Sequence, residues 1–216
     1  MLDSFVSWTH GAIRKGAVAL FLFAAVGAAA HSAPKTVLVL GDSLSAEYGL
    51  QRGSGWVALA ERRLAEQHID ARVVNASISG DTTSGGRARL PALMGQHPDV
   101  LVIELGANDG LRGLPLAAAQ DNLRAMLALA RQSKVKVLLV GMRIPPNYGR
   151  DYTDQFAGMY GALAKEYKAA LVPFMLEGVA DKDALFQADH LHPLAEAHPT
   201  ILANIWPQLH TLLKAK

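Results

Sequence analysis

The 216-residue sequence contains no cysteine, and its formal net charge is only +2. Without thiols the chain forms neither disulfides nor cysteine-ligated metal sites, and a cysteine nucleophile is excluded. The small net charge and the lack of lysine and arginine runs give no basic surface of the kind that attracts nucleic acid. We therefore do not expect nucleic acid as a partner of this protein.

The sequence also lacks an apolar run of the length that a transmembrane helix needs, about 20 residues. The apolar run at residues 16–30 follows Arg14 and Lys15 and ends in small residues. This order of basic, apolar and small residues is typical of a secretory signal peptide. We expect residues 1–33 to be a cleavable signal peptide of a periplasmic or secreted protein, and residues 34–216 to form one domain without membrane insertion. An uncleaved membrane anchor is the alternative.

Five apolar, β-branched segments recur along the rest of the chain. They cover residues 36–40, 71–77, 99–105, 134–141 and 169–175. Near-continuous hydrophobicity is typical of strands that are buried on both faces. We therefore expect five buried strands.

Helical patterns separate these segments. They cover residues 54–68, 84–96, 115–132, 151–168 and 194–212. In the last of them, Pro207 should kink or split the helix. Alternating strands and helices predict an α/β fold, a three-layer αβα sandwich around a parallel sheet of about five strands.

Four expected loops contain polar residues that suit a site. They are "GDSLS" at 41–45, "SISGDTTSGG" at 77–86, "GANDG" at 106–110 and "DHLHP" at 189–193. Ligands of open parallel sheets bind beyond the carboxyl ends of the strands. The fold should therefore bring these loops to one edge.

The residues of these loops meet the requirements of a serine nucleophile. Ser43 would attack, His192 would accept its proton, and Asp189, three positions earlier, would orient the imidazole. The backbone N–H of Gly80 and the side-chain amide of Asn108 are donors suited to an oxyanion. We also expect a helix to begin near Ser43, with free backbone N–H groups at its start. Taken singly, each residue also fits a turn or a helix cap.

Together the four segments resemble the sequence blocks of the GDSL, or SGNH, hydrolases, and the resemblance covers residues 35–210. Within that family the chain is most similar to bacterial thioesterases, lysophospholipases and arylesterases. The resemblance implies a flavodoxin-like fold, a catalytic triad of Ser43, Asp189 and His192, and no metal or organic cofactor. It also implies an oxyanion hole formed by the backbone N–H groups of Ser43 and Gly80 and the side chain of Asn108.

The activity that this resemblance implies is that of a serine esterase. Such an enzyme would hydrolyse carboxylic ester and thioester bonds of acyl-CoA thioesters, lysophospholipids and aryl esters through an acyl-enzyme. Two other functions remain open, a carbohydrate deacetylase of the same superfamily and a periplasmic binding module without catalysis. One feature departs from the family pattern, since His190 falls inside the last block. His190 and His192 could therefore form a His-x-His metal pair.

A further match lies in "RIPPNYGRDY" at residues 143–152. Adjacent prolines and an aromatic residue suit a stiff lip beside an acyl groove, so we expect Pro145 and Tyr148 to contact substrate. An ordinary surface loop is the alternative.

Overall fold

A central parallel sheet organises residues 33–215, the part of the chain that the computed structural model describes. The strands are β1 (Lys35–Gly41), β2 (Ala71–Asn75), β3 (Val100–Glu104), β4 (Lys136–Val140) and β5 (Ala170–Val172). Their order in the sheet is β2-β1-β3-β4-β5, and every neighbouring pair is parallel. The expected fold class is therefore confirmed. The expected signal peptide lies outside the described residues, apart from Ala33.

The three central strands supply the core of the sheet. β3 is buried along its whole length, and β1 and β4 are buried except at their first residues. The two edge strands differ, because β2 has no fully buried residue and only Val172 of β5 is buried. The prediction of burial on both faces was therefore wrong for the edge strands, whose outer sides have no neighbouring strand.

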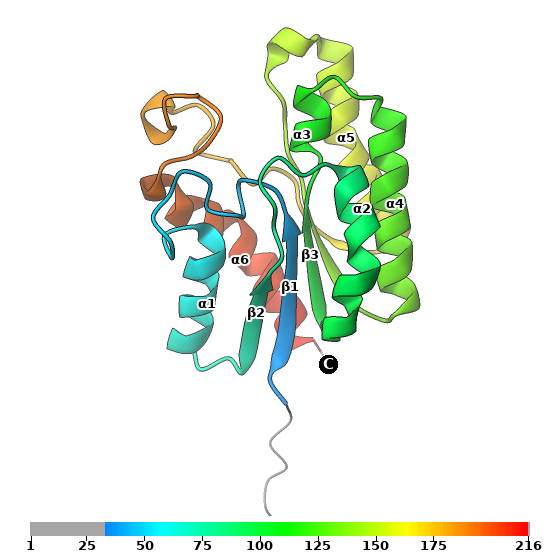
Figure 1. The fold of residues 1–216 in the computed structure, drawn as a ribbon, viewed down its shortest axis with the longest axis vertical. Coiled ribbons are helices and arrows are strands. Elements are labelled where there is room, and N and C mark those ends of the chain that lie inside the picture. The colour runs from blue at the N-terminus through cyan, green and yellow to red at the C-terminus, as the bar shows by residue number, and fades with distance from the viewer. Residues whose placement is uncertain (1–32, 216) are drawn as a thin grey trace, which may run out of the picture. The chain divides into compact units, whose positions relative to one another are not determined.

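The described part of the chain contains six α-helices, and the longer ones cover the two faces of the sheet. The six are α1 (Trp56–Glu66), α2 (Thr83–Leu93), α3 (Ala107–Leu111), α4 (Leu116–Gln132), α5 (Arg150–Tyr167) and α6 (His198–Lys214). Helices α1 and α6 lie together on one face, and α2, α4 and α5 cover the other (Figure 1). Within residues 33–215, no helix combines the length and the apolar character that crossing a membrane requires.

Two local expectations need correction. Helix α6 runs from His198 to Lys214, so the expected split at Pro207 was wrong, whereas a kink there stays a prediction. Proline removes one backbone hydrogen bond, and the burial of Ile205 and Leu209 on either side of it offsets that loss. The segment "GANDG", expected to be a loop, contains the short helix α3, which begins directly after Gly106 at a φ of 120°.

Candidate active site

The loops that follow the carboxyl ends of the strands converge at the upper edge of the sheet in Figure 1. β1 leads into the segment that carries Ser43, β2 into the segment of Gly80, and β3 into helix α3 with Asn108. Asp189 and His192 lie in the long segment between β5 and α6. The parallel topology therefore assembles the predicted site residues from four distant parts of the sequence.

Ser43 follows β1 in a series of turns. No helix begins there, since α1 starts at Trp56, and the expected helix start at Ser43 was wrong. Instead, the Asp42 side chain organises the turn, because its Oδ1 atom accepts the Leu44 backbone N–H at 3.0 Å. A short side chain that accepts a backbone N–H two residues on stabilises a turn without a helix.

A chain of hydrogen bonds connects the three residues of the predicted triad. The Nε2 atom of His192 lies 2.9 Å from Ser43 Oγ, and its Nδ1 atom lies 2.6 Å from Asp189 Oδ2. The other carboxylate oxygen of Asp189 accepts the backbone N–H groups of Leu191 and His192, both at 3.0 Å. This arrangement fixes the carboxylate against the imidazole within one turn of the chain.

The pKa of Asp189 reflects these contacts. Its partial burial raises the pKa, but the hydrogen bonds from the backbone of His192 and Leu191 and from the His192 ring outweigh this effect and lower the pKa from 3.8 to about 2. Hydrogen bonds to the charged form of a carboxyl group favour ionisation. Asp189 is therefore an anion at neutral pH and can stabilise a positively charged His192.

One neighbour of His192 was not foreseen. The ring of Tyr48 packs against the imidazole with a centroid distance of 4.3 Å and an interplanar angle of 38°. Tyr48 lies five residues after Ser43 in the same turn-rich segment, and no sequence pattern marks it as a contact of a residue near position 192. The contact restricts the imidazole on a side that the hydrogen bonds leave open.

The predicted oxyanion donors are the backbone N–H groups of Ser43 and Gly80 and the side chain of Asn108. In the described residues, neither the Ser43 nor the Gly80 backbone N–H donates a hydrogen bond to the protein. Gly80 has a φ of 78°, a conformation that favours glycine. The Ile78 N–H donates to the Gly41 carbonyl oxygen at 3.0 Å, which ties the Gly80 segment to the end of β1. Asn108 donates from Nδ2 to Asp42 Oδ2 at 3.1 Å.

A buried pair of carboxyl groups lies beneath the Ser43 turn. The sheet register places Glu104 beside Gly41, and Glu104 Oε2 accepts the Ser45 hydroxyl at 2.7 Å and the Asp42 N–H at 3.3 Å. The Trp56 indole N–H donates to Ser45 Oγ at 3.1 Å. A Cβ atom at Gly41 would lie 2.8 Å from both Glu104 Oε2 and Ser45 Oγ, so the first residue of "GDSLS" must be glycine.

Burial dominates the acidity of this pair. It raises the pKa of Asp42 from 3.8 to about 6, although the hydrogen bond from Leu44, the charge of His192 and the hydrogen bond from Asn108 all lower it. Burial also raises the pKa of Glu104 well above its usual 4.5, and the charge of Asp42 raises it further. Burial and the charge of Asp42 therefore both favour the protonated form of Glu104. Sequence reasoning missed Glu104, because one acidic residue at the end of a strand carries no signal of its own.

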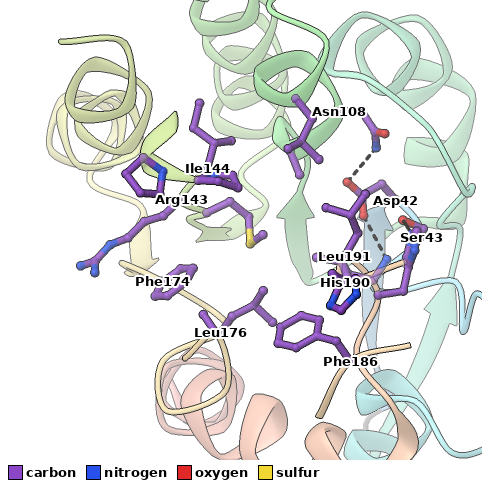
Figure 2. Close-up of a pocket in the computed structure, with 18 residues that line it drawn as sticks. Asp42, Ser43, Asn108, Arg143, Ile144, Phe174, Leu176, Phe186, His190 and Leu191 are labelled. Carbon is purple, nitrogen blue, oxygen red and sulfur yellow. Dashed lines mark hydrogen bonds between the residues drawn. The ribbon is translucent and has the colours of Figure 1, made fainter. Parts of the chain in front are cut away.

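A cleft of about 450 Å³ opens beside Ser43, His192 and Asn108. Figure 2 shows Asp42, Ser43 and Asn108 on one side and Arg143, Ile144 and Phe174 on the other. Most of the lining side chains are apolar, and they come from α3, from the segment after β4 and from the segment after β5.

The two residues expected to contact substrate differ in position. Pro145 lines the cleft, whereas Tyr148 is not among the residues that line it. The Tyr148 hydroxyl donates to the Leu111 carbonyl oxygen at 2.8 Å, and its side chain is partly exposed.

His190 also borders the cleft, but it pairs with a different carboxylate. Its Nδ1 atom lies 2.6 Å from Asp183 Oδ1, and its backbone has a φ of 57°. Residues 33–215 contain no group of three histidine or carboxylate side chains placed to hold a metal ion. His190 and His192 thus each contact their own aspartate.

Known proteins share this architecture and these sequence blocks. The profile of the GDSL-like lipase/acylhydrolase family matches residues 39–199. The chain is 53% identical to esterase TesA of Pseudomonas aeruginosa over 184 residues, which cover 85% of this chain and 92% of that protein. It is 41% identical to thioesterase 1/protease 1/lysophospholipase L1 of Escherichia coli K12 over 194 residues, 89% of this chain and 92% of that protein.

The fold agrees with these sequence matches. A crystal structure of TesA superposes with a TM-score of 0.80 at 54% identity, covering 82% of this chain and 99% of that chain. The matched region contains all four loops that carry the predicted site residues. The chain therefore belongs to the GDSL-like lipase/acylhydrolase family and is a hydrolase of the esterase type.

Proposed function

We propose that this esterase cleaves acyl esters and thioesters through an acyl-enzyme formed on Ser43. The observation that carries the proposal is the continuous hydrogen-bond chain from Asp189 through His192 to Ser43, which ends at an apolar cleft. A serine hydroxyl is a weak nucleophile until a base accepts its proton. The chain of contacts supplies that base and the group that orients it.

The reaction follows from the geometry in two halves. His192 Nε2 takes the Ser43 proton as Oγ attacks the acyl carbon, and the charge that develops on the carbonyl oxygen is stabilised by the N–H donors of Ser43, Gly80 and Asn108. The intermediate then expels the alcohol or thiol, which takes the proton from His192. A water molecule, deprotonated by His192, attacks the acyl-enzyme and releases the carboxylic acid and the free serine.

The lining of the cleft supports acyl substrates. Apolar side chains such as Leu111, Ile144 and Phe174 suit a hydrocarbon chain, and Pro145 adds a rigid apolar surface. Substrates of this class include acyl-CoA thioesters, lysophospholipids and aryl esters. We keep Tyr148 as a proposed contact for substrates that extend beyond the cleft.

Two measurements test this function. Ser43→Ala should abolish turnover of p-nitrophenyl esters and labelling by a fluorophosphonate, while Ser54→Ala, in the same segment, should retain both. Among acyl lengths from acetyl to palmitoyl, kcat/KM should favour chains longer than acetyl. A maximum at acetyl, with turnover of acetylated sugars, would instead support the carbohydrate deacetylase.

We also propose that the protein is exported and that residues 1–33 are removed. The basic, apolar and small residues of this segment support the proposal. N-terminal sequencing of protein from the periplasm or medium should find a start near residues 31–34. An intact Met1 on membrane-bound protein would show an anchor instead.

A further inference from the structure

The side chain of Asn108 lies between two hydrogen-bond acceptors. Its Nδ2 atom donates to Asp42 Oδ2 at 3.1 Å and to the Asp81 carbonyl oxygen at 2.9 Å. A primary amide has two N–H bonds on its nitrogen. Each of these two N–H bonds therefore donates to a group that only accepts hydrogen bonds.

These acceptors decide which end of the amide faces them. The oxygen and nitrogen of an asparagine side chain have nearly the same size, so packing alone does not distinguish the two orientations. A reversed Asn108 would place its own oxygen against a carboxylate and a carbonyl, with no hydrogen between them. The contacts thus select the orientation in which nitrogen, and not oxygen, is held beside Asp42.

Asp42 is unusually well fixed for this purpose. The residue is 1% exposed, and its Oδ1 atom accepts the Leu44 N–H in the turn that carries Ser43. Stabilising that turn accounts for the contact of Oδ1. It does not account for the contact of Oδ2 with Asn108, which lies in helix α3. Figure 2 shows the Asp42 carboxylate between the Ser43 turn and Asn108.

The charge of Asp42 depends on the groups around it. Its neighbours are Glu104 from β3, His192 from the segment after β5, and Asp81, itself paired with Arg89 at 2.8 Å. Burial raises the Asp42 pKa only to about 6. At pH 8 its carboxylate is ionised and accepts hydrogen bonds without donating any.

We propose that Asp42 is a positioning residue whose carboxylate keeps the nitrogen, and not the oxygen, of the Asn108 amide on the side where the oxyanion forms. This inference rests on the proposed role of Asn108 in the oxyanion hole. Both N–H bonds of the amide are engaged in this structure, so the oxyanion would replace or share the contact with the Asp81 carbonyl oxygen, while the contact with Asp42 keeps the nitrogen beside the Ser43 turn. Donors fixed before charge develops stabilise a transition state more than donors that must reorient.

The first test is kinetic and uses Asp42→Asn at pH 8. The new amide replaces one of the two acceptor oxygens with a donor, so it cannot serve both Leu44 and Asn108 as the carboxylate does. We expect kcat to fall about tenfold or more and KM to stay within about twofold, because the contact acts through the transition state. An unchanged kcat would overturn the proposal.

A second variant separates positioning from turn stability. Asp42→Ser keeps a short oxygen that can accept the Leu44 N–H, but its side chain is too short to reach Asn108. It should show the same loss of kcat with near wild-type thermal stability. Retention of wild-type kcat would show that the turn, and not Asn108, is what Asp42 serves.

A double-mutant cycle then identifies the residue through which Asp42 acts. In an Asn108→Ala background, Asp42→Asn should lower kcat by less than about twofold, since residues that act through one another are not additive. Additive losses would overturn the positioning role. If Asn108→Ala alone retains wild-type kcat, the proposed oxyanion role of Asn108 is wrong, which is a separate result.

Asp109 provides a matched control on the same short helix. It is also buried, but its carboxylate accepts the backbone N–H and the hydroxyl of Thr83 and accepts no hydrogen bond from the Asn108 side chain. Asp109→Asn should lower thermal stability and keep kcat within about threefold of wild type. A loss of kcat equal to that of Asp42→Asn would mean that any buried carboxylate here disturbs the site, and it would overturn the assignment.

Discussion

The Nε2 atom of His192 lies 2.9 Å from the Oγ atom of Ser43, although 149 positions separate the two residues in the chain. Ser43 is fixed by the end of the central strand β1, and His192 by a turn that its partner Asp189 closes. The distance is that of a hydrogen bond. The sheet therefore presents the two residues as a pair.

The two histidines of "DHLH" should differ strongly in their effect on activity. His192→Ala should lower kcat by several orders of magnitude, because it removes the group in contact with both Ser43 and Asp189. His190→Ala should cost less than about tenfold, since His190 pairs with Asp183 instead. Steady-state kinetics on a p-nitrophenyl ester would measure both. An inactive His190 variant beside an active His192 variant would place the base two residues earlier.

Chelation tests the alternative metal pair. The Nδ1 atoms of His190 and His192 each lie 2.6 Å from a different aspartate. We expect prolonged dialysis against EDTA to leave kcat/KM unchanged. A loss of activity that Zn²⁺ restores would instead show that these histidines share a metal ion.

The buried Glu104 should make folding stability depend on pH. Burial raises its pKa above the unfolded value of 4.5, so above about pH 4.5 the folded state keeps a proton that the unfolded state releases. Stability from this group is complete below pH 4.5 and falls as pH rises toward the folded pKa. Glu104→Gln cannot ionise and keeps an acceptor for Ser45.

Melting temperatures at pH 5 and pH 8 measure this effect. The Glu104→Gln variant should gain stability relative to wild type between these two values, whereas the exposed Glu61→Gln should follow wild type. Parallel curves for wild type and Glu104→Gln would contradict a neutral, buried Glu104.

Two glycines should respond in opposite ways to alanine. A Cβ at Gly110 would lie 2.8 Å from a ring carbon of Phe156 and 2.9 Å from Ile144, so Gly110→Ala should destabilise the protein by about 1–3 kcal/mol. Gly158, exposed in α5, has nothing within 4 Å of a new Cβ. Gly158→Ala should stabilise by about 0.5–1 kcal/mol. Urea unfolding of both variants would measure the difference, and equal effects would contradict the tight packing of α3.

Because the cleft wall includes Ile144, Gly110→Ala should also alter acyl-chain preference. The ratio of kcat/KM for butyryl and octanoyl esters should change in Gly110→Ala and not in Gly158→Ala. An unchanged ratio in both variants would show that this wall does not contact the acyl chain.

The sequence by itself determined the α/β fold, the family and the residues that the structure brings together as Ser43, His192 and Asp189. Hydrophobic runs and local turns are short-range features, and the parallel sheet they imply leaves one edge for the connecting loops. Asp189 and His192 were also within reach of sequence reasoning, because a three-residue spacing allows a contact within one turn.

Only the tertiary structure decided the contacts between these loops. The pairing of Gly41 with Glu104 depends on the register of β1 and β3, and the contacts of Asn108 with Asp42 and of Tyr48 with His192 join loops that follow different strands. No periodicity encodes such pairs, because each depends on how separate elements pack against one another. The same reason explains why Pro145 lines the cleft while Tyr148, three residues later, donates to the Leu111 carbonyl oxygen and is not among the lining residues.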